Sequence, residues 1–462
     1  MSDSAEDLPL MAGTVRPRID DPVLLPGLTL GSMTDRICAL ALRERAFLWW
    51  WIAVLPTGFL TLVLIASIIW LFYAGIGIWG VDWPVDWGFA IIEYVWWIAI
   101  ASGGTFISAL FYLMRVEWRT ATNRIAESMT LFAAACAGLF PILHLGRPWL
   151  FYWLFPYPNT MGYWPQWRSP LLWDFYAILT YVTSSVLFWY LGLVPDLASM
   201  RDRAATRGKQ VFYGVLAFGF RGTSAQWRHW HATYAILAAI MAALVCSVHS
   251  IVGLDFAGGA TVGWHSTQFP PFFIFGAFLS GFAMVIILIL PLRRLMRLEQ
   301  MITGRHIDVL CRLMATSGLA LTYAYIMDAF TTWYGAELAD RTMFAARTTG
   351  MYLYVYWATI AFNVLAPQLM WFRRLRMNQV IVLLVSVLVI IGMWFERYEI
   401  VVTSLHRTHL PSAWGVFHGT YWDLATLVGS VGFFFFGMLL IVRLMPMISM
   451  SEMRALIQKK QS

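Results

Sequence analysis

Charged side chains are scarce in this chain of 462 residues, where they make up 12% of the total. A typical soluble domain carries about 25% charged residues, so the scarcity excludes an ordinary soluble protein. Apolar side chains take their place, because 60% of the residues are hydrophobic and the mean hydropathy is +0.66. The composition therefore indicates an integral membrane protein.

Cysteine is also scarce. The four cysteines, Cys38, Cys136, Cys246 and Cys311, lie far apart, and no CxxC or CxxCH sequence is present. Covalent c-type haem and a cysteine-ligated iron–sulfur cluster both need clustered thiols. Neither group is therefore expected on this chain, and any redox reaction would depend on cofactors that neighbouring subunits hold.

Long apolar runs are what the chain has in abundance. A helix needs roughly 20 apolar residues to cross a bilayer, and lipid offers no partners to an unpaired backbone, so helices are expected. Transmembrane barrels would show short alternating segments instead. We predict an all-α polytopic membrane protein with ten transmembrane helices. They lie near 47–76, 87–114, 122–145, 171–194, 230–253, 269–292, 308–334, 344–372, 378–402 and 421–447.

Lysine and arginine alternate between the two sides of these spans. With the N-terminus in the cytoplasm, 26 of the 32 basic residues fall in the terminal tails and the even-numbered loops. Basic residues gather on the cytoplasmic side of membrane proteins, so both termini are predicted to be cytoplasmic. The net charge of +7 then reflects topology and attraction to anionic lipid, and nucleic-acid binding is not expected.

Three regions are expected along the chain: a cytoplasmic arm over residues 1–46, a transmembrane domain over 47–447 and a cytoplasmic tail over 448–462. The arm shows no cleavable signal pattern, and it is expected to lie along a partner or the membrane surface. The basic loop 195–229 is expected to be a solvated connector. The aromatic loop 146–170 suits either a belt at the lipid headgroups or a docking surface or lid.

Ionisable residues gather at the outer ends of the apolar runs, where charge is costly and is usually kept for pairing, binding or proton transfer. They are His144, Arg147, Asp174, His249, Asp255 and Arg397. Oxidation of a quinol needs a neutral histidine or a carboxylate to accept each phenolic proton, and an arginine to hold negative charge nearby. Aromatic walls are offered by Trp173, Phe175, Trp394 and Phe395. The alternative is ordinary salt bridging at the interface.

The histidines of the chain raise the question of whether it binds haem or a metal ion. A b-type haem needs two histidines at one depth, which His144 and His249 offer at the outer side and His231 and His306 at the inner side. The outer pair lies among carboxylates that suit a protonated substrate better, so no haem is expected. His406, His409 and His418 share a loop but fit no standard zinc spacing, so no metal is expected either.

Several long motifs are distinctive. HLGRPWLFYWLFPYPN, WRSPLLWDFYA, SVHSIVGLDFA and FERYEIVV resemble the NrfD/PsrC family of quinone-interacting membrane subunits, and most closely the ActC subunits of alternative complex III, a quinol:cytochrome c oxidoreductase. The resemblance spans the whole hydrophobic region and implies two four-helix bundles with two flanking helices. The positions of His144 and His249 in one half, and of Asp328 and Arg397 in the other, suit such a repeat.

The resemblance also implies function. It places a quinol, here expected to be menaquinol, near the periplasmic face in the first bundle, at His144, Asp174, His249 and Asp255 with Arg397 nearby. Arg147, Trp173 and Trp394 would complete the pocket. The implied partners are a periplasmic iron–sulfur or molybdopterin-like subunit, c-type haem subunits and a second NrfD-like membrane subunit, all in a bacterial inner membrane. No cofactor would be bound by this chain itself.

Two alternatives remain beside that expectation. The chain could be the quinone-reactive anchor of another oxidoreductase of the polysulfide reductase type, or an anchor without catalytic residues. A transporter would instead show charged or broken helices near the midplane. The family resemblance also implies a role in proton translocation, for which the candidates are Glu127, Ser128, His231, Arg312, Tyr323, Tyr325 and Asp328. Polar residues that only pack helices together would give the same pattern.

Overall fold

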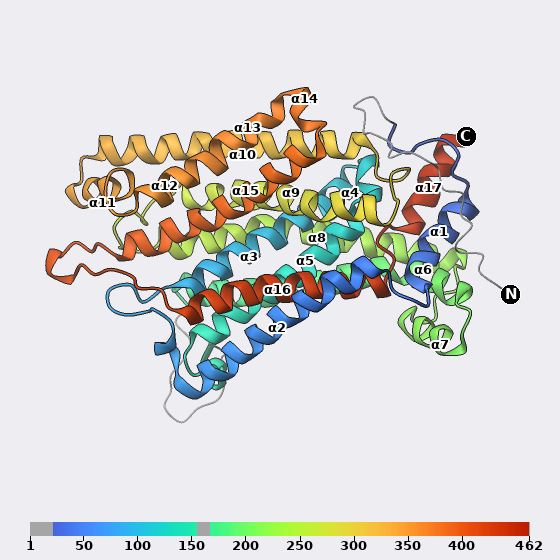
Figure 1. Ribbon diagram of the computed structural model, residues 1–462, viewed down its shortest axis with the longest axis horizontal. Coiled ribbons are helices and arrows are strands. Elements are labelled where there is room, and N and C mark those ends of the chain that lie inside the picture. The colour runs from blue at the N-terminus through green and yellow to red at the C-terminus, as the bar shows by residue number, and fades with distance from the viewer. Residues whose placement is uncertain (1–21, 155–166, 462) are drawn as a thin grey trace.

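The computed structural model describes residues 22–154 and 167–461. Over these residues, helices run side by side, and ten of them are long and apolar enough to cross a membrane (Figure 1). The predicted class, an all-α polytopic membrane protein with ten spans, is thereby confirmed. The spans are Leu48–Ala74 (α2), Phe89–Leu113 (α3 and α4), Asn123–His144 (α5), Leu172–Arg203 (α6, which begins at Pro170), Ser224–Ala257 (α8), Phe269–Leu295 (α9), Gly304–Gly335 (α10), Leu353–Trp371 (α12 and α13), Gln379–Thr403 (α15) and Tyr421–Leu444 (α16).

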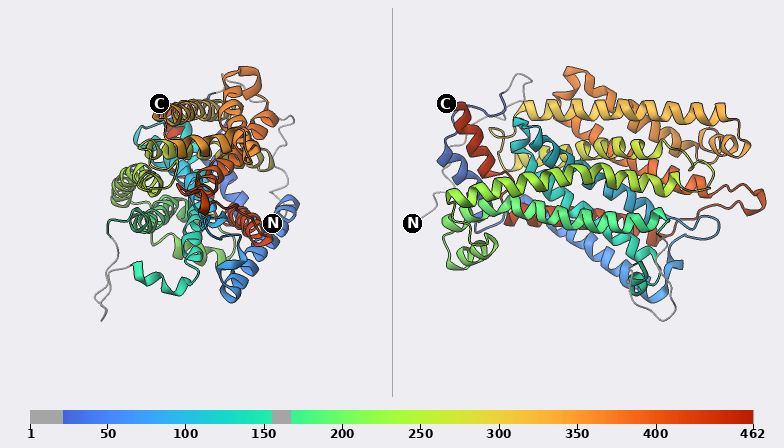
Figure 2. Two further views of the ribbon diagram at one scale, coloured as in Figure 1. Left: turned by 90° about the vertical axis from the view of Figure 1, so that its left-hand side faces the viewer. Right: turned by 180° about the vertical axis from the view of Figure 1, so that it is seen from behind.

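Shorter helices complete the chain. They are α1 (Leu30–Leu42), α7 (Arg207–Leu216), α11 (Leu338–Thr348), α14 (Arg373–Arg376) and α17 (Met450–Gln461), with 3₁₀ turns at Ile76–Ile78, Glu117–Ala121, Pro148–Leu154, Leu369–Trp371 and Pro411–Ala413. Helices α1, α7 and α17 lie at one end of the molecule, the α1 end, and α11 lies at the other, the α11 end (Figures 1 and 2). The predicted topology assigns the α1 end to the cytoplasm.

The ten spans form two four-helix bundles and a flanking pair, as predicted. Helices α3, α5, α6 and α8 pack together in the first bundle, and α9, α10, the α12–α13 segment and α15 in the second. Helices α3 and α9 join the bundles across a glycine contact, at which a Cβ built on Gly103 would lie 2.3 Å from the Cα of Gly281. Backbones can approach this closely only where small residues face each other.

The flanking pair consists of α2 and α16, the first and last of the ten spans. They pack along each other, and α16 also contacts α5 of the first bundle. A Cβ on Gly432 would lie 2.3 Å from the Cβ of Leu60, so the glycine provides the space into which α2 packs. Most of α2 faces outwards, as expected of a helix in contact with lipid.

Helix ends differ from the prediction in two places. The stretch 195–229 is largely helical, because α6 continues to Arg203, α7 buries Tyr213, and Thr223 begins α8 with a capping box to Gln226. The predicted span 344–372 is divided, since α11 ends at Thr348 and the spanning segment begins at Leu353. Helix α7 was predicted to be part of a loop because it is amphipathic and lacks a continuous apolar run.

The described part of the N-terminal arm folds against the chain itself. Helix α1 buries Met33, Ile37 and Cys38 against α6, α16 and α17. Asp35 pairs with Arg203 at 2.8 Å, so the α1 end closes over the bundles. The described part of the arm therefore packs on the chain itself, and the expected contact with a partner or the membrane surface stays a prediction.

Candidate functional site

A group of three polar residues lies in the first bundle near the α11 end: Tyr94 on α3, Asp174 on α6 and Asp255 on α8. The Tyr94 hydroxyl donates to Oδ2 of Asp174 at 2.5 Å. Pro170 at the start of α6 fixes where that helix begins, so Asp174 faces inwards one turn later. The Asp255 carboxyl is near enough to act electrostatically on both partners. We call this trio the first-bundle cluster.

The first-bundle cluster has unused hydrogen-bonding capacity. Oδ1 of Asp174 and Oδ1 of Asp255 are both buried and have no hydrogen-bond partner among the described residues. A buried acceptor without a partner costs about 1–3 kcal/mol, so such groups are usually satisfied by a ligand or by water. The arrangement therefore suits a ligand that brings hydroxyl groups.

His249 and Arg397 extend the polar region from the first bundle to the second. His249 lies on α8, 1% exposed, and neither ring nitrogen has a side-chain partner in the described part of the chain. Arg397 on α15 is equally buried, stands 4.2 Å above the ring of Phe273 and pairs with Glu396 at 2.7 Å. The charge of Arg397 reaches His249 electrostatically. The predicted neighbours are thus brought together across the bundle junction.

Beyond Arg397, Glu396 begins a hydrogen-bonded group in the second bundle. The Tyr325 hydroxyl donates to Oε2 of Glu396, and the Asn363 amide donates to the same oxygen at 3.3 Å. Asn363 lies in the π-helical turn Ile360–Leu365 that continues α12. Such turns are frequent at functional sites because they redirect side chains within an otherwise regular helix.

A cavity opens beside this group at the α11 end. Its water-accessible volume is about 40 Å³, it is partly open to the surroundings, and Tyr325, Asp328, Arg347, Glu396 and Glu399 supply its polar lining. Its remaining lining residues are Gly263, Ser266, Gln268, Phe269, Phe272, Tyr356 and Ile400. We call it the second-bundle cavity.

Arg347 is held firmly at the wall of this cavity. Its guanidinium donates to the Thr403 hydroxyl at 2.7 Å and to the Ser404 hydroxyl at 2.9 Å, and lies 3.6 Å from the carboxylate of Glu399. The π-helical turn Glu399–Thr403 at the end of α15 brings these acceptors to one side. The cavity therefore holds fixed charges of both signs.

The other predicted pocket residues differ in their exposure and contacts. His144 ends α5 with a buried Nδ1, and the group that acts on it electrostatically is Asp86. Arg147 is exposed, and Trp173 is 41% exposed with its indole donating to the Trp167 carbonyl. Trp394 packs at the bundle junction, 5.0 Å from the ring of Phe89. Part of the aromatic loop, 155–166, lies outside the described residues.

The residues predicted for proton transfer divide into buried and exposed ones. Glu127 lies near the α1 end, paired with Arg124 at 2.7 Å and accepting from Tyr234 at 2.7 Å. Asp328 and Tyr325 line the second-bundle cavity. His231 and Tyr323 face outwards, the latter 67% exposed.

Other predicted candidates have structural partners. Ser128 accepts the indole N–H of Trp189 at 3.2 Å, and Arg312 pairs with Asp308 at 2.9 Å. In the His406 loop, Nδ1 of His406 contacts the Gly415 carbonyl and His409 contacts the Ala260 carbonyl at 3.2 Å. Burial lowers the pKa of His406.

Two functional candidates were missed in the sequence, Tyr94 and its neighbour Glu93. Glu93 is fully buried, and neither of its carboxyl oxygens has a hydrogen bond to a described residue. A lone glutamate inside an apolar run is itself a signal, because such a group is costly to retain. The tyrosine gave no comparable signal, since tyrosine is common throughout this sequence.

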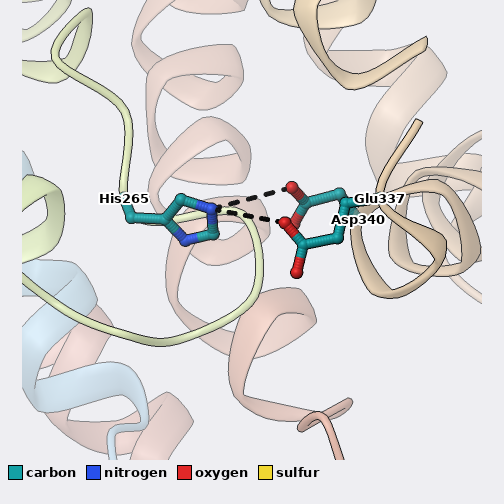
Figure 3. A group of neighbouring side chains, drawn as sticks. All are labelled: His265, Glu337 and Asp340. Atoms are coloured by element: carbon teal, nitrogen blue, oxygen red, sulfur yellow. Dashed lines mark ion pairs between the residues drawn. The ribbon is translucent and has the colours of Figure 1, made fainter. Parts of the chain in front are cut away.

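A further group of metal-type donors was not expected. His265, Glu337 and Asp340 present one ligand atom each, all within 4.8 Å of one another, at the α11 end (Figure 3). Two of the three side chains are exposed and Asp340 is partly buried. Among residues 22–154 and 167–461, it is the only group of three or more metal-type donors.

Known proteins resemble this chain over the same region. Residues 77–408 match a family described as Polysulphide reductase, NrfD, which covers both bundles and leaves out the flanking helices. The chain is 24% identical over 349 residues to a Halobacterium salinarum protein named as a putative membrane subunit of dimethyl sulfoxide reductase, with 72% of each chain covered. It is 23% identical over 223 residues to a selenate reductase subunit of Mesobacillus selenatarsenatis, covering 44% of this chain and 47% of that protein.

Proposed function

The chain belongs to the polysulphide reductase NrfD family, and from this premise we propose that it is the quinone-reactive membrane subunit of a multisubunit reductase. Both named relatives are reductase subunits, one of them a membrane subunit. They favour a reductase complex over alternative complex III, to which the motifs also bear a likeness. The partner would be a catalytic subunit with its own redox centres, in a prokaryotic cytoplasmic membrane.

The observation that carries this proposal is the first-bundle cluster. Asp174 has one oxygen fixed by Tyr94 and the other buried and free to accept a proton or a hydrogen bond. Asp255 supplies a second free acceptor beside it, and His249 a third on the same helix. A quinol that releases two protons needs two acceptors near its two hydroxyl groups, within a surface that also buries its apolar ring.

The chemistry at the site is a two-electron oxidation. Menaquinol, as the proposed substrate, would give one proton to Asp174 and one to Asp255 or His249, and both electrons to the redox centre of the partner. The quinone would then leave into the lipid. Tyr94 positions the Asp174 carboxylate. The protons would leave at the α11 end, because Asp174 lies one turn into α6 and Asp255 lies in the last turn of α8.

Arg397 and the second-bundle cavity are proposed as secondary parts of the site. Arg397 would place positive charge between the two bundles while the quinol is oxidised. Asp328 and Tyr325 would offer protonatable groups on the second-bundle side, and Glu127 at the α1 end. His144, Arg147, Trp173 and Trp394 would form the entrance and walls rather than accept protons.

The test is quinol oxidation by the purified complex, with the presence of every subunit verified in the same preparation. Asp174→Asn keeps an oxygen for the Tyr94 hydroxyl but removes the charge, and it should lower turnover of a water-soluble naphthoquinol by about 10²–10⁴-fold. Asp82→Asn is the matched control, because Asp82 is exposed in a loop at the same end and its Oδ1 bonds only the neighbouring backbone N–H. Normal turnover of Asp174→Asn in an intact complex would contradict the assignment.

A further inference from the structure

We propose that His265, Glu337 and Asp340 bind one divalent transition-metal ion of the zinc class. The ion would fasten the loop between α8 and α9 to the turn between α10 and α11. This proposal is independent of the quinone chemistry, because it concerns a different group of residues. It rests on the spacing of the ligand atoms, on their chemistry and on how each one is held.

The spacing suits a single ion. Nε2 of His265 lies 3.9 Å from Oε2 of Glu337 and 3.8 Å from Oδ2 of Asp340 (Figure 3). With metal–ligand bonds of about 2.0–2.2 Å, tetrahedral ligands lie roughly 3.3–3.6 Å apart. The histidine nitrogen therefore needs to approach each carboxylate by only a few tenths of an ångström. All three ligand atoms lie within 4.8 Å of one another, and rotations of the two solvent-facing side chains can close the remaining gap.

The donor set selects the class of ion. One neutral imidazole and two carboxylates carry a charge of about −2, which a divalent cation neutralises. Magnesium and calcium prefer all-oxygen ligands, whereas imidazole suits zinc and neighbouring transition metals. Water from the exposed side would fill the remaining coordination position. Without a metal, the same contact needs a protonated histidine, which is the competing explanation.

Local structure explains why the three side chains converge. Trp264 is buried and donates to the Ile400 carbonyl at 2.7 Å, so the next residue, His265, is directed outwards. Glu337 occupies the N-cap position of α11, and Asp340 lies in the first turn of that helix, three residues later. The two carboxylates therefore point the same way, towards the histidine.

Asp340 is oriented by a hydrogen bond that leaves its other oxygen free. The backbone N–H of Gly263 donates to Oδ1 at 3.0 Å, so Oδ2 faces His265. Gly263 has a φ of +78°, a conformation that favours glycine, and this turn brings the loop against α11. A carboxylate held in this way is typical of metal sites, in which a hydrogen bond orients the ligand.

The proposed metal site lies next to the wall of the second-bundle cavity. Gly263 and Ser266 belong to the same loop and line that cavity. A metal at His265 would therefore stiffen one wall of it. Trp264 anchors the loop on its inner side and Gly263 bonds Asp340, and the ion would add a further attachment on the outer side.

The first measurement is zinc stoichiometry. The full chain, in detergent, free of any polyhistidine tag and stripped with a chelator, is dialysed against Zn²⁺ alone and its metal content is determined. Wild type should retain about one zinc per chain. His265→Gln, Glu337→Gln and Asp340→Asn should each retain a small fraction of that. Asp340→Asn is informative because it preserves the acceptor for Gly263.

The matched control is His418→Gln, which removes an exposed histidine at the same end of the molecule and should leave zinc binding unchanged. Cobalt in place of zinc should give visible absorption bands that His265→Gln loses. Equal zinc binding by wild type and His265→Gln, or no stoichiometric zinc in wild type, would overturn the site. Equal loss in His418→Gln would assign the metal to surface histidines and overturn it as well.

Fastening of the loop has its own readout. Hydrogen–deuterium exchange of the peptide that contains 258–268 should slow when zinc is added to wild type and stay unchanged in His265→Gln. Stoichiometric binding without slower exchange would leave the metal site standing and refute the attachment of the loop. A protonated-histidine pair would instead respond to pH and not to zinc.

Discussion

Replacing Gly103 with alanine should force the two bundles apart. Gly103 on α3 faces Gly281 on α9, and a Cβ there would meet only backbone: the Gly281 Cα at 2.3 Å and the Ala277 carbonyl oxygen at 2.6 Å. A side chain could rotate away from such a clash, but two helix backbones cannot. The added carbon can therefore be accommodated only by separating the helices.

The size of the effect follows from contact distances. Non-bonded carbon atoms settle at about 3.5–4.0 Å, so the helices must separate by roughly 1.2–1.7 Å at this point. Overpacking of a tightly packed interior costs about 1–3 kcal/mol. Gly103 also lies on the helix that carries Tyr94, and a misplacement of about 1 Å can lower an enzyme's turnover up to about a hundredfold. Both stability and quinol oxidation should therefore fall.

The assay can use the protein's own cysteines. Cys38, Cys136 and Cys311 are buried and Cys246 is exposed, so in a Cys246→Ser background a thiol-reactive fluorophore reports unfolding alone. Gly138→Ala is the matched control, because it makes the same substitution in α5 at a site where the new Cβ meets nothing closer than 4.0 Å. Alanine also favours the helix more than glycine, so the control should be neutral or slightly stabilising.

Gly281→Ala should reproduce the loss, since its Cβ would lie 2.2 Å from the Gly103 Cα. A melting temperature for Gly103→Ala within about 1 °C of the Gly138→Ala control would refute the close crossing of α3 and α9. Loss of stability without loss of quinol oxidation would support the close contact of α3 and α9 but show that this contact does not determine the position of Tyr94.

Three further outcomes are expected. Arg124→Ala leaves two buried carboxylates uncompensated near the α1 end and should cost about 3–5 kcal/mol, measured in the same melting assay; an unchanged melting temperature would contradict the ion-pair network. Burial raises the pKa of the Cys38 thiol to about 11, so at pH 8 iodoacetamide should modify Cys38 much more slowly in the folded protein than in the unfolded protein, as mass spectrometry can show. Burial lowers the pKa of His406, so on acidification the unfolded chain takes up a proton before the folded chain does, and the stability of the fold should decrease below about pH 6.5. The difference in melting temperature between wild type and His406→Gln should therefore become smaller towards pH 5. A difference that stays constant with pH would refute this effect of His406.

Depth in the membrane could be predicted from the sequence, because it depends on counting residues from the end of an apolar run. Asp174 and Asp255 were placed at one end of their helices on that basis, and the structure brings them together beside Tyr94. The ten spans followed from run length in the same way. The division at α11 did not, because a polar turn inside an otherwise apolar stretch barely changes the average.

Rotation about the helix axis was much harder to predict. Tyr323 and Tyr325 are two residues apart, about 200° around a helix, and one is exposed while the other lines a cavity. A span that is apolar on all sides carries little periodic signal to show which face is inside.

The pairing of α2 with α16 has a consequence for how the protein is made. Roughly 370 residues separate the starts of the two helices, yet they are each other's main packing partner. At about 5–20 residues per second, a ribosome needs some 20–75 s to deliver the second helix after the first. During that interval α2 must wait in the bilayer with the leucine row around Leu60 and Leu64 unmatched, available to lipid, to an insertase or to a neighbouring chain.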